Sequence, residues 1–483
     1  MSSLEGLEPK NIWKHFAEIL KIPRCSGNET VIGDYIISFA KEKGIEWDKD
    51  EVGNVVIRKK PTPGHEDADG VILQGHLDMV CEKNSDIDHD FSKDPIQIEI
   101  NGEWVKAKGT TLGADNGIGI AASLAIMEEE DLVHGLLEAL FTVEEETGLT
   151  GATQISPEFL KGKNLLNLDS EDEGEFTIGC AGGADTKIFL PLERESQPIE
   201  NAHLLKIKGL KGGHSGVDID LGRANAIQVL ARFLFKIGAD LPVKLVSCKG
   251  GNLRNAIPRE AEAVISCDPN RVDELKAAMD KTFVEFKEEF RVVEPDAGME
   301  FSSFKENALP PLTEKSQIQM INFLFTIPHG VITMHAEMEG LVETSTNLAV
   351  IHTHEDQAEI ICSTRSSVAS ALQATRETIL ALGQMVGAEV VLEEGYPGWT
   401  PKLDSPLLKT LKDVYKMTFD KEAHVAAIHA GLECGILGEK YPDMDKISFG
   451  PTIKFPHSPD EKVHVGDVDK FYTFLKAVIS ELA

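Results

Sequence analysis

Short apolar runs alternate with helical stretches through the first third of this sequence and again near its end. The apolar runs are VILQ at 71–74, LEALFTV at 137–143, LLNL at 165–168 and KISFG at 446–450. Helical spacing of apolar residues occurs before, between and after these runs, at 8–21, at 28–44 with Asn28 as the expected cap, at 117–130 and from 467. Strands that alternate with helices are typical of the α/β class with a mostly parallel central sheet. The sequence also predicts a β-hairpin around Asn101-Gly102.

The pattern changes in the middle of the chain. It breaks at the glycine-rich CAGGAD of 180–185 and returns after GYPGW at 395–399, and the intervening strands and helices favour an antiparallel sheet covered by helices. AEAVISC from Ala261 and AEIICS from Ala358 are each followed by a helical stretch, which indicates an internal duplication or a chance similarity. We therefore predict a discontinuous domain of residues 1–184 and 396–483, interrupted by an inserted α+β domain of residues 185–395.

Charge excludes several classes of partner. The chain of 483 residues has 48 Lys and Arg against 80 Asp and Glu, a formal charge of −32, which repels nucleic acids and anionic membranes and also favours solubility. We expect no nucleic-acid and no membrane partner. The seven cysteines are scattered, and the N-terminal residues lack the apolar segment of a secretory signal. We therefore expect reduced thiols in a cytoplasmic protein.

Polar residues stand where the predicted strands end. The list is His76 and Asp78 after VILQ, Glu144 to Glu146 after LEALFTV, Asp169 after LLNL, His457 after KISFG, and Asp115 just before a helix. In open α/β sheets, ligands bind beyond the carboxyl ends of the strands. Taken alone, Asp115 could be a helix cap, the glutamates a solvated turn and His76 a core histidine. Their coincidence at five ends favours one shared site.

Two histidines with several carboxylates form a ligand set for divalent metals such as zinc. More than four such groups indicate two ions, which repel each other unless an anionic ligand lies between them. Asp115 is the natural bridge because its glycine-rich surroundings allow a close approach of the backbone. Asp78 follows His76 by two residues and can accept the second imidazole N–H, which holds the ring in its ligating tautomer.

The motifs GHLDMV, GTTLGADNGIG, EEETG, NLDSE and FPHSPDEKV resemble, in order and spacing, those of the dinuclear zinc peptidases that include aminoacylase, carboxypeptidase G and several bacterial di- and tripeptidases. IKGLKGGHSG, GGNLRNAIPREA, IHAGLECG and GPTIKFPHSPDEKVH are similar to the aminoacyl-histidine dipeptidase (peptidase D, carnosinase-like) branch. The resemblance covers nearly the whole chain. It implies a zinc-peptidase catalytic domain split by an inserted lid, and we expect a homodimer.

The resemblance also implies a role for each site residue. His76, Asp115 and Asp169 would bind one metal ion, and Asp115, Glu146 and His457 the other, with zinc expected and cobalt or manganese as substitutes. Asp78 would orient His76. Glu145 would be the general base and acid that deprotonates water between the two ions and protonates the leaving amine. This assignment aligns the motif on Thr147-Gly148; the other register shifts these roles to Glu144 and Glu145.

Substrate contacts are expected from the inserted domain. His214 in GGHSG matches an oxyanion donor by resemblance. A dipeptide carries a free carboxylate that needs a charge-assisted partner, for which Arg365 is the candidate, with Asn255 hydrogen-bonding nearby. His429 and Glu433 are possible wall residues. The expected activity is hydrolysis of small peptides, above all dipeptides such as Xaa-His, including β-alanyl-histidine. The alternatives are an N-acyl amino acid deacylase or a carboxypeptidase, and a catalytically inactive binding protein.

Overall fold

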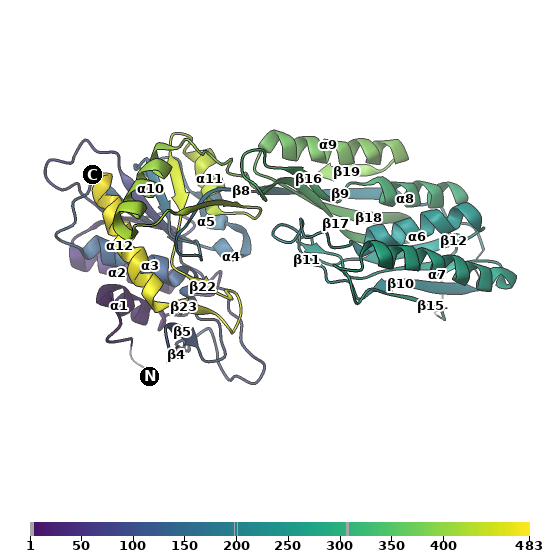
Figure 1. The fold of residues 1–483 in the computed structure, drawn as a ribbon, viewed down its shortest axis with the longest axis horizontal. Helices are drawn as coiled ribbons and strands as arrows, with labels where there is room; N and C mark the ends of the chain where they lie inside the picture. Colours follow the sequence, from purple (N-terminus) through teal and green to yellow (C-terminus); the bar gives the residue numbers. More distant parts are fainter. Residues whose placement is uncertain (1–3, 198, 200, 306–308) are drawn as a thin grey trace. The chain divides into compact units, whose positions relative to one another are not determined.

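The computed structural model describes residues 4–197, 199, 201–305 and 309–483. The chain divides into two compact units (Figure 1). The first unit comprises Met1–Gly179, Trp399–Ala427 and Leu432–Ala483, and the second unit comprises Cys180–Gly398 and Ile428–Gly431.

The first unit contains an eight-stranded sheet. In spatial order its strands are β1 (Glu46–Lys49), β2 (Val55–Lys59), β6 (Leu137–Thr142), β3 (Val71–His76), β7 (Asn164–Asn167), β21 (Asp445–Ser448), β8 (Glu175–Cys180) and β20 (His424–Ile428). The four central strands, from β6 to β21, are parallel, whereas β1, β2 and β8 pair antiparallel with their neighbours. The mostly parallel sheet predicted above is therefore a mixed one, parallel at its centre.

Helices and a smaller sheet complete the first unit. The helices are α1 (Lys10–Ile19), α2 (Thr30–Lys43), α3 (Ala114–Glu128), α4 (Glu145–Gly148), α5 (Thr150–Gln154), α10 (Pro406–Phe419), α11 (Glu433–Lys440) and α12 (Val465–Glu481). The predicted hairpin is confirmed as β4 (Ile98–Asn101) and β5 (Trp104–Ala107), which form a four-stranded sheet with β22 (Ile453–Lys454) and β23 (Lys462–His464). The loop between β22 and β23 carries His457.

Two local predictions are wrong. The N-cap of α2 is Glu29 and not Asn28, and the carboxylate of Glu29 accepts backbone N–H groups of Gly27 and Glu144. Cys25 and Cys81 form a disulfide, with their Cα atoms 5.7 Å apart, while the other five cysteines are not disulfide-bonded. A backbone bridge between Cys25 and Met79 brings the two segments together. The two cysteines are 56 residues apart in the sequence, so no local spacing indicates that they pair.

The second unit is an antiparallel sheet covered by helices. Its strands in spatial order are β15 (Gly298–Ser303), β10 (Ala202–Lys208), β14 (Ala261–Ser266), β12 (Lys244–Gly250), β17 (Val342–Thr353), β18 (Gln357–Ser366), β9 (Gly182–Pro191) and β19 (Glu389–Leu392), with β16 (Gly330–Met334) paired to β17. The helical elements are α6 (Ala226–Asp240), η1 (Pro269–Arg271), α7 (Val272–Glu289), α8 (Glu314–Thr326) and α9 (Ala369–Val386). A short ribbon, β11 (Gly213–His214) with β13 (Ala256–Ile257), carries His214.

The core of the second unit lies between its sheet and its helices. Neighbouring helices pack against one another in the order α7, α6, α8, α9, and α6, α8 and α9 contact the strands. Phe233, Phe286 and Phe323 are fully buried in this layer. The two strands with similar sequences, β14 and β18, are both followed by a helix, and the duplication stays a prediction.

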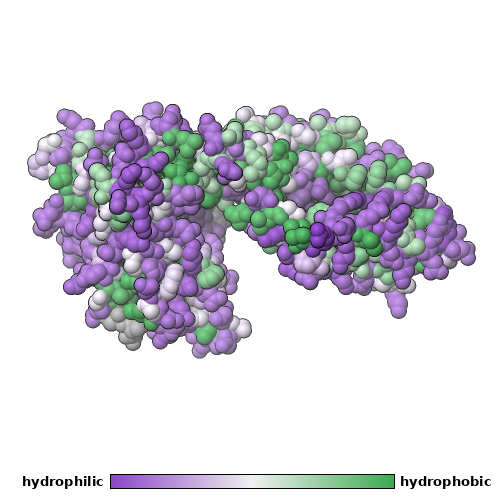
Figure 2. All heavy atoms as spheres, in the orientation of Figure 1, coloured by the Kyte–Doolittle hydropathy of each residue, from purple (hydrophilic) through white to green (hydrophobic). Residues whose placement is uncertain are grey.

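Hydrophilic side chains cover most of the face of each unit drawn in Figure 2, with smaller hydrophobic patches between them. This agrees with the strong acidic excess of the sequence. Among the described residues, no helix is both long and apolar enough to span a bilayer.

Candidate metal centre and active site

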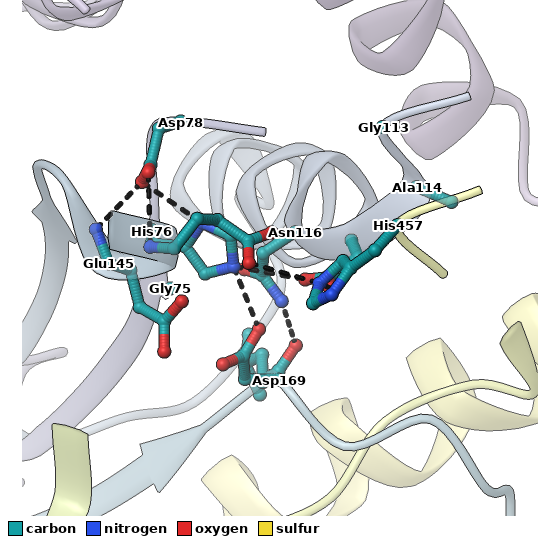
Figure 3. A network of polar contacts seen from close by, with 12 residues as sticks. Gly75, His76, Asp78, Gly113, Ala114, Asn116, Glu145, Asp169 and His457 are labelled. Atoms are coloured by element: carbon teal, nitrogen blue, oxygen red, sulfur yellow. Dashed lines mark hydrogen bonds and ion pairs between the residues drawn. The ribbon is translucent and has the colours of Figure 1, made fainter. Parts of the chain in front are cut away.

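The parallel strands deliver the predicted site residues to one edge of the first sheet. His76 is the last residue of the fully buried strand β3, and Asp169 follows β7. The His76 Nε2 atom lies 3.3 Å from Asp169 Oδ1, and its Nδ1 atom lies 3.3 Å from Asp78 Oδ1. Figure 3 shows the side chains of His76, Asp169 and His457 pointing toward one another.

Asp115 lies between the two imidazoles. Its Oδ1 atom is 2.9 Å from His76 Nε2, and its Oδ2 atom is 3.2 Å from His457 Nε2. Asp115 can point this way because it does not have helical backbone angles, although it lies within the first turn of α3. Gly75 permits the close packing of this turn on β3, since a Cβ atom there would lie 2.1 Å from Asn116 Oδ1.

The three consecutive glutamates differ in backbone conformation and in the contacts of their side chains. Glu144 has a left-handed backbone with φ of 50°, and α4 begins at Glu145. Glu146 Oε2 lies 3.0 Å from His457 Nε2, whereas no hydrogen bond or ion pair joins the Glu145 carboxylate to another residue drawn in Figure 3. The geometry thus places Glu146 among the ligand-type groups and leaves the Glu145 carboxylate available to a reacting molecule.

Asp78 connects the end of β3 to the start of α4. Its carboxylate is fully buried and faces His76, and it accepts hydrogen bonds from the backbone N–H groups of Glu145 (3.0 Å) and Glu146 (3.2 Å). Ser26, which the sequence analysis did not single out, donates its hydroxyl to the same carboxylate at 2.7 Å. Burial alone would raise the pKa of Asp78, but His76 and Ser26 lower it to about 2. Asp78 is therefore ionised and able to orient His76.

The electrostatics of the cluster favour a cation. Burial and the neighbouring Asp115 and Glu146 carboxylates raise the pKa of Asp169, because a further negative charge is unfavourable there. Hydrogen bonds that His457 donates to the carboxylates of Asp115 and Glu146 raise its pKa to about 11. Both pKa shifts arise because the carboxylates lie close together without enough positive charge among them.

The donor set fits divalent metal ions. Ligand atoms of His76, Asp115 and Glu146 all lie within 4.8 Å of one another. Glu146 Oε1 is buried and has no hydrogen-bond partner among the described residues. Imidazole nitrogens and carboxylate oxygens are the donors that borderline divalent ions prefer. With one oxygen of Asp115 toward each imidazole, the residues present suit two ions that share this carboxylate.

Glu433 forms a buried network next to this cluster. Its Oε2 atom accepts hydrogen bonds from Gln74 Nε2 (2.6 Å) and Thr142 Oγ1 (2.8 Å), and burial raises its pKa to about 7. His429, the other expected wall residue, belongs to the second unit, where its Nε2 atom lies 2.7 Å from Ser345 Oγ.

The second unit brings together the three expected substrate contacts. Arg365 on β18 is 8% exposed, and it donates hydrogen bonds to Ser215 Oγ (3.3 Å) and Tyr396 Oη (2.9 Å). Ser215 adjoins His214 and donates its backbone N–H to the carbonyl oxygen of Asn255 at 2.8 Å. Among the described residues, no carboxylate forms an ion pair with Arg365. A buried guanidinium with only neutral partners is suited to bind an anion.

His214 has a defined hydrogen-bonding state. Its Nδ1 atom accepts hydrogen bonds from the backbone N–H groups of Gly216 and Val217, both at 3.2 Å. Burial and the charge of Arg365 lower the pKa of His214. The neutral ring therefore carries its proton on Nε2 and can donate from that atom.

Comparison with known proteins gives the chain its family. It is 44% identical over 483 residues, 100% of this chain and 99% of the relative, to the Cytosol non-specific dipeptidase of Escherichia coli (strain K12). Residues 205–293 match the M20 model described as the peptidase dimerisation domain. The chain belongs to the M20 family of peptidases.

Solved structures agree with this M20 assignment. The aminoacylhistidine dipeptidase from Vibrio alginolyticus has a TM-score of 0.91 and 42% identity, covering 99% of this chain and 98% of that one. The aminopeptidase PepT from Bacillus cereus has a TM-score of 0.57 and 15% identity, with 99% of both chains covered, which shows a common fold only. The α/β class with an inserted second domain, predicted from the sequence, is thereby confirmed.

Proposed function

We propose that this M20 peptidase is a metal-dependent dipeptidase that cleaves small peptides, with Xaa-His dipeptides, including β-alanyl-histidine, among its substrates. The observation that carries the proposal is the position of Asp115, whose two oxygens face two imidazoles, beside the available carboxylate of Glu145. The names of the Escherichia coli and Vibrio alginolyticus relatives support the choice of dipeptides and of C-terminal histidine.

The metal ligands in this proposal fall into two groups that share Asp115. His76 and Asp169 would hold one ion with Asp115, and Glu146 and His457 the other. Two divalent ions, with zinc expected and cobalt or manganese as substitutes, would polarise the scissile carbonyl and lower the pKa of a water molecule. Asp78 would keep His76 in its ligating tautomer through the Nδ1 contact.

Glu145 would move the proton during hydrolysis. Burial, and then the nearby carboxylates Asp169, Glu433 and Glu146 against the opposing effect of His76, raise the pKa of Glu145 well above its usual value. A carboxylate with a raised pKa can accept a proton from water and return it to the leaving nitrogen. The oxygen of the water bonds to the carbonyl carbon, the carbon–nitrogen bond breaks as the leaving nitrogen receives that proton, and a carboxylic acid and a free amine remain.

The second unit would bind the substrate. Arg365 would pair with the C-terminal carboxylate of the dipeptide, and Asn255 would hydrogen-bond beside it. The Nε2 proton of His214 would stabilise the oxyanion that develops on the scissile carbonyl. The absence of a carboxylate partner for Arg365 among the described residues, and the proton position of His214, support these roles.

We further propose a cytoplasmic homodimer. The match of residues 205–293 to a peptidase dimerisation domain supports dimer formation, and the name of the Escherichia coli relative supports a cytosolic location. Size-exclusion chromatography with light scattering tests the dimer, which a monomeric mass at working concentration would exclude.

The test of the activity is hydrolysis by the purified, metal-loaded protein. Free dipeptides, including Xaa-His and β-alanyl-histidine, are compared with acetylated amino acids and with longer peptides. We expect turnover of dipeptides and little turnover of acetylated amino acids. Rapid turnover of acetylated amino acids alone would establish the deacylase alternative, and release of C-terminal residues from long peptides the carboxypeptidase alternative.

A further inference from the structure

Glu461 lies four residues after His457, and its carboxylate is bound by the turn that carries Asp115. Its Oε2 atom accepts the backbone N–H groups of Leu112 (2.7 Å) and Gly113 (2.9 Å), and its Oε1 atom accepts those of Ala114 (2.7 Å) and Asp115 (3.3 Å). The residue is 2% exposed. One buried side chain therefore connects the His457 loop to four consecutive amides beside Asp115.

The backbone N–H groups of this turn need a hydrogen-bond acceptor from outside the helix. Gly113 has a left-handed backbone with φ of 71°, and the backbone angles of Asp115 and Asn116 are not helical, so the start of α3 is irregular. Amides at a helix start have no partner within the helix, and burying them unpaired is costly. Consecutive amides that converge in this way form an anion-binding concavity. Here Glu461 occupies it.

A buried arginine contacts the same turn from its carbonyl side. Arg24 is 2% exposed and donates hydrogen bonds to the carbonyl oxygens of Leu77 (3.0 Å), Asp78 (2.6 Å) and Gly113. A Cβ atom at Gly113 would lie 2.6 Å from the Arg24 guanidinium, so glycine allows this contact. Arg24 thus connects the Asp115 turn to the segment that follows His76.

We propose that Glu461, assisted by Arg24, is a positioning residue that holds Asp115 between His76 and His457 before any metal ion binds. The Asp115 oxygens lie 2.9 and 3.2 Å from the two imidazoles, so a shift of the turn would break the alignment on which shared ligation depends. The inference rests on the proposed two-metal site, and neither Glu461 nor Arg24 is among its ligands.

The test is metal affinity in Glu461→Gln. Glutamine keeps one acceptor oxygen, but it removes the charge and turns an NH2 group toward two amide donors. We expect the affinity of the metal-free variant for Zn²⁺, measured by calorimetric titration, to fall by about 10- to 100-fold, the range typical for groups that orient metal ligands. Excess Zn²⁺ should restore much of the dipeptidase activity, because the ligands themselves are intact.

Glu138→Gln is the matched control. Glu138 is also fully buried in the first unit, where it accepts the backbone N–H groups of Lys161 (2.8 Å) and Gly162 (2.7 Å) and a hydrogen bond from Arg58 (2.9 Å). It lies near the amino end of β6, away from the metal cluster. We expect this variant to lose thermal stability but to bind Zn²⁺ like the unmodified protein. Equal loss of affinity in both variants, or unchanged affinity in Glu461→Gln, would overturn the proposal.

Hydrogen exchange of the unmodified, metal-free protein provides a second measurement if Glu461→Gln fails to fold. The amides of residues 112–115 should be protected before metal is added. Rapid exchange that slows only on addition of Zn²⁺ would show that the metal and not Glu461 orders the turn. Two-ion binding without hydrolysis of dipeptides would instead overturn the proposed function and leave the role of Glu461 standing.

Discussion

Asp115 is the residue on which a two-ion centre depends most directly, because it is the only proposed ligand shared by both ions. Its side chain is 12% exposed, whereas that of His457 is 50% exposed and contacts only one side of the cluster. We expect Asp115→Ala to lose both ions together and His457→Ala to lose one ion first. Metal analysis after dialysis measures this, with the exposed Asp460→Ala as a control.

One tightly bound ion per chain in fully active, unmodified protein would contradict the shared role of Asp115. Retention of one ion by Asp115→Ala would do the same. Either result would require a mononuclear site built from fewer of these ligands.

Glu145 and Glu144 are adjacent in sequence but differ in structure. The left-handed backbone of Glu144 separates it from α4, in which Glu145 and Glu146 lie. Glu145→Gln keeps the size of the side chain but removes its basicity, so kcat should fall by about 10² to 10⁴ with metal content unchanged. Glu144→Gln should have little effect on either quantity. Loss of metal in Glu145→Gln would show that the roles belong to Glu144 and Glu145.

At the residue scale, the sequence pattern predicted the polar residues that follow strand ends, but it missed residues that hold those side chains in position. His76, Asp169 and the glutamates directly follow apolar runs, which a linear pattern records. Ser26, Arg24 and Glu461 act through partners 52 to 349 positions away, and most of these contacts are with backbone atoms. No local spacing encodes such partners, so these residues were missed even though Glu461 lies within a recognised motif.

At the element scale, alternation predicted the four parallel strands but not the edges of the sheet. β3 and β6 are buried throughout and β7 is nearly so, which is the signature of a central parallel strand, whereas β21 is buried only in its second half. The exposed strand β1 and the glycine-containing β8 and β9 have weaker patterns, and the glycines there were interpreted only as a domain break. Whether an edge strand pairs parallel or antiparallel depends on the path of the chain between the strands. Hydrophobic periodicity carries no information about that path.

The disulfide links the segment of Arg24 to the segment after His76, so it should stabilise the first unit. Loop-closure entropy for a separation of 56 residues gives about 4 kcal/mol as an upper value. We expect Cys81→Ser to lower the free energy of unfolding by about 2–4 kcal/mol relative to the oxidised protein. Urea unfolding with and without reductant measures this, with the free thiol variant Cys267→Ser as control. Seven titratable thiols in protein purified without reductant would show that the bond is absent.

At the scale of the whole molecule, the proposed reaction requires residues from both units, with the metal ligands and Glu145 in the first and Arg365 in the second. Under the proposal, Arg365 binds the terminal carboxylate of the substrate, and the bond that is cleaved is the last peptide bond, as in a dipeptide. A substrate without that terminal charge would lose its pairing with Arg365.

We expect free dipeptides to be cleaved far better than their C-terminally amidated forms. Arg365→Ala should remove most of that difference, a loss of about 2–5 kcal/mol in transition-state binding for a buried, hydrogen-bonded charge pair. Arg376→Ala is the matched control, because Arg376 is equally buried but donates to the backbone carbonyls of Asp185 and Glu393. The ratio of kcat/KM for free and amidated dipeptides is the measurement, since it is insensitive to partial loss of folded protein. Equal rates on both substrates in the unmodified enzyme would exclude Arg365 as the carboxylate site, because amidation removes the charge that Arg365 would bind.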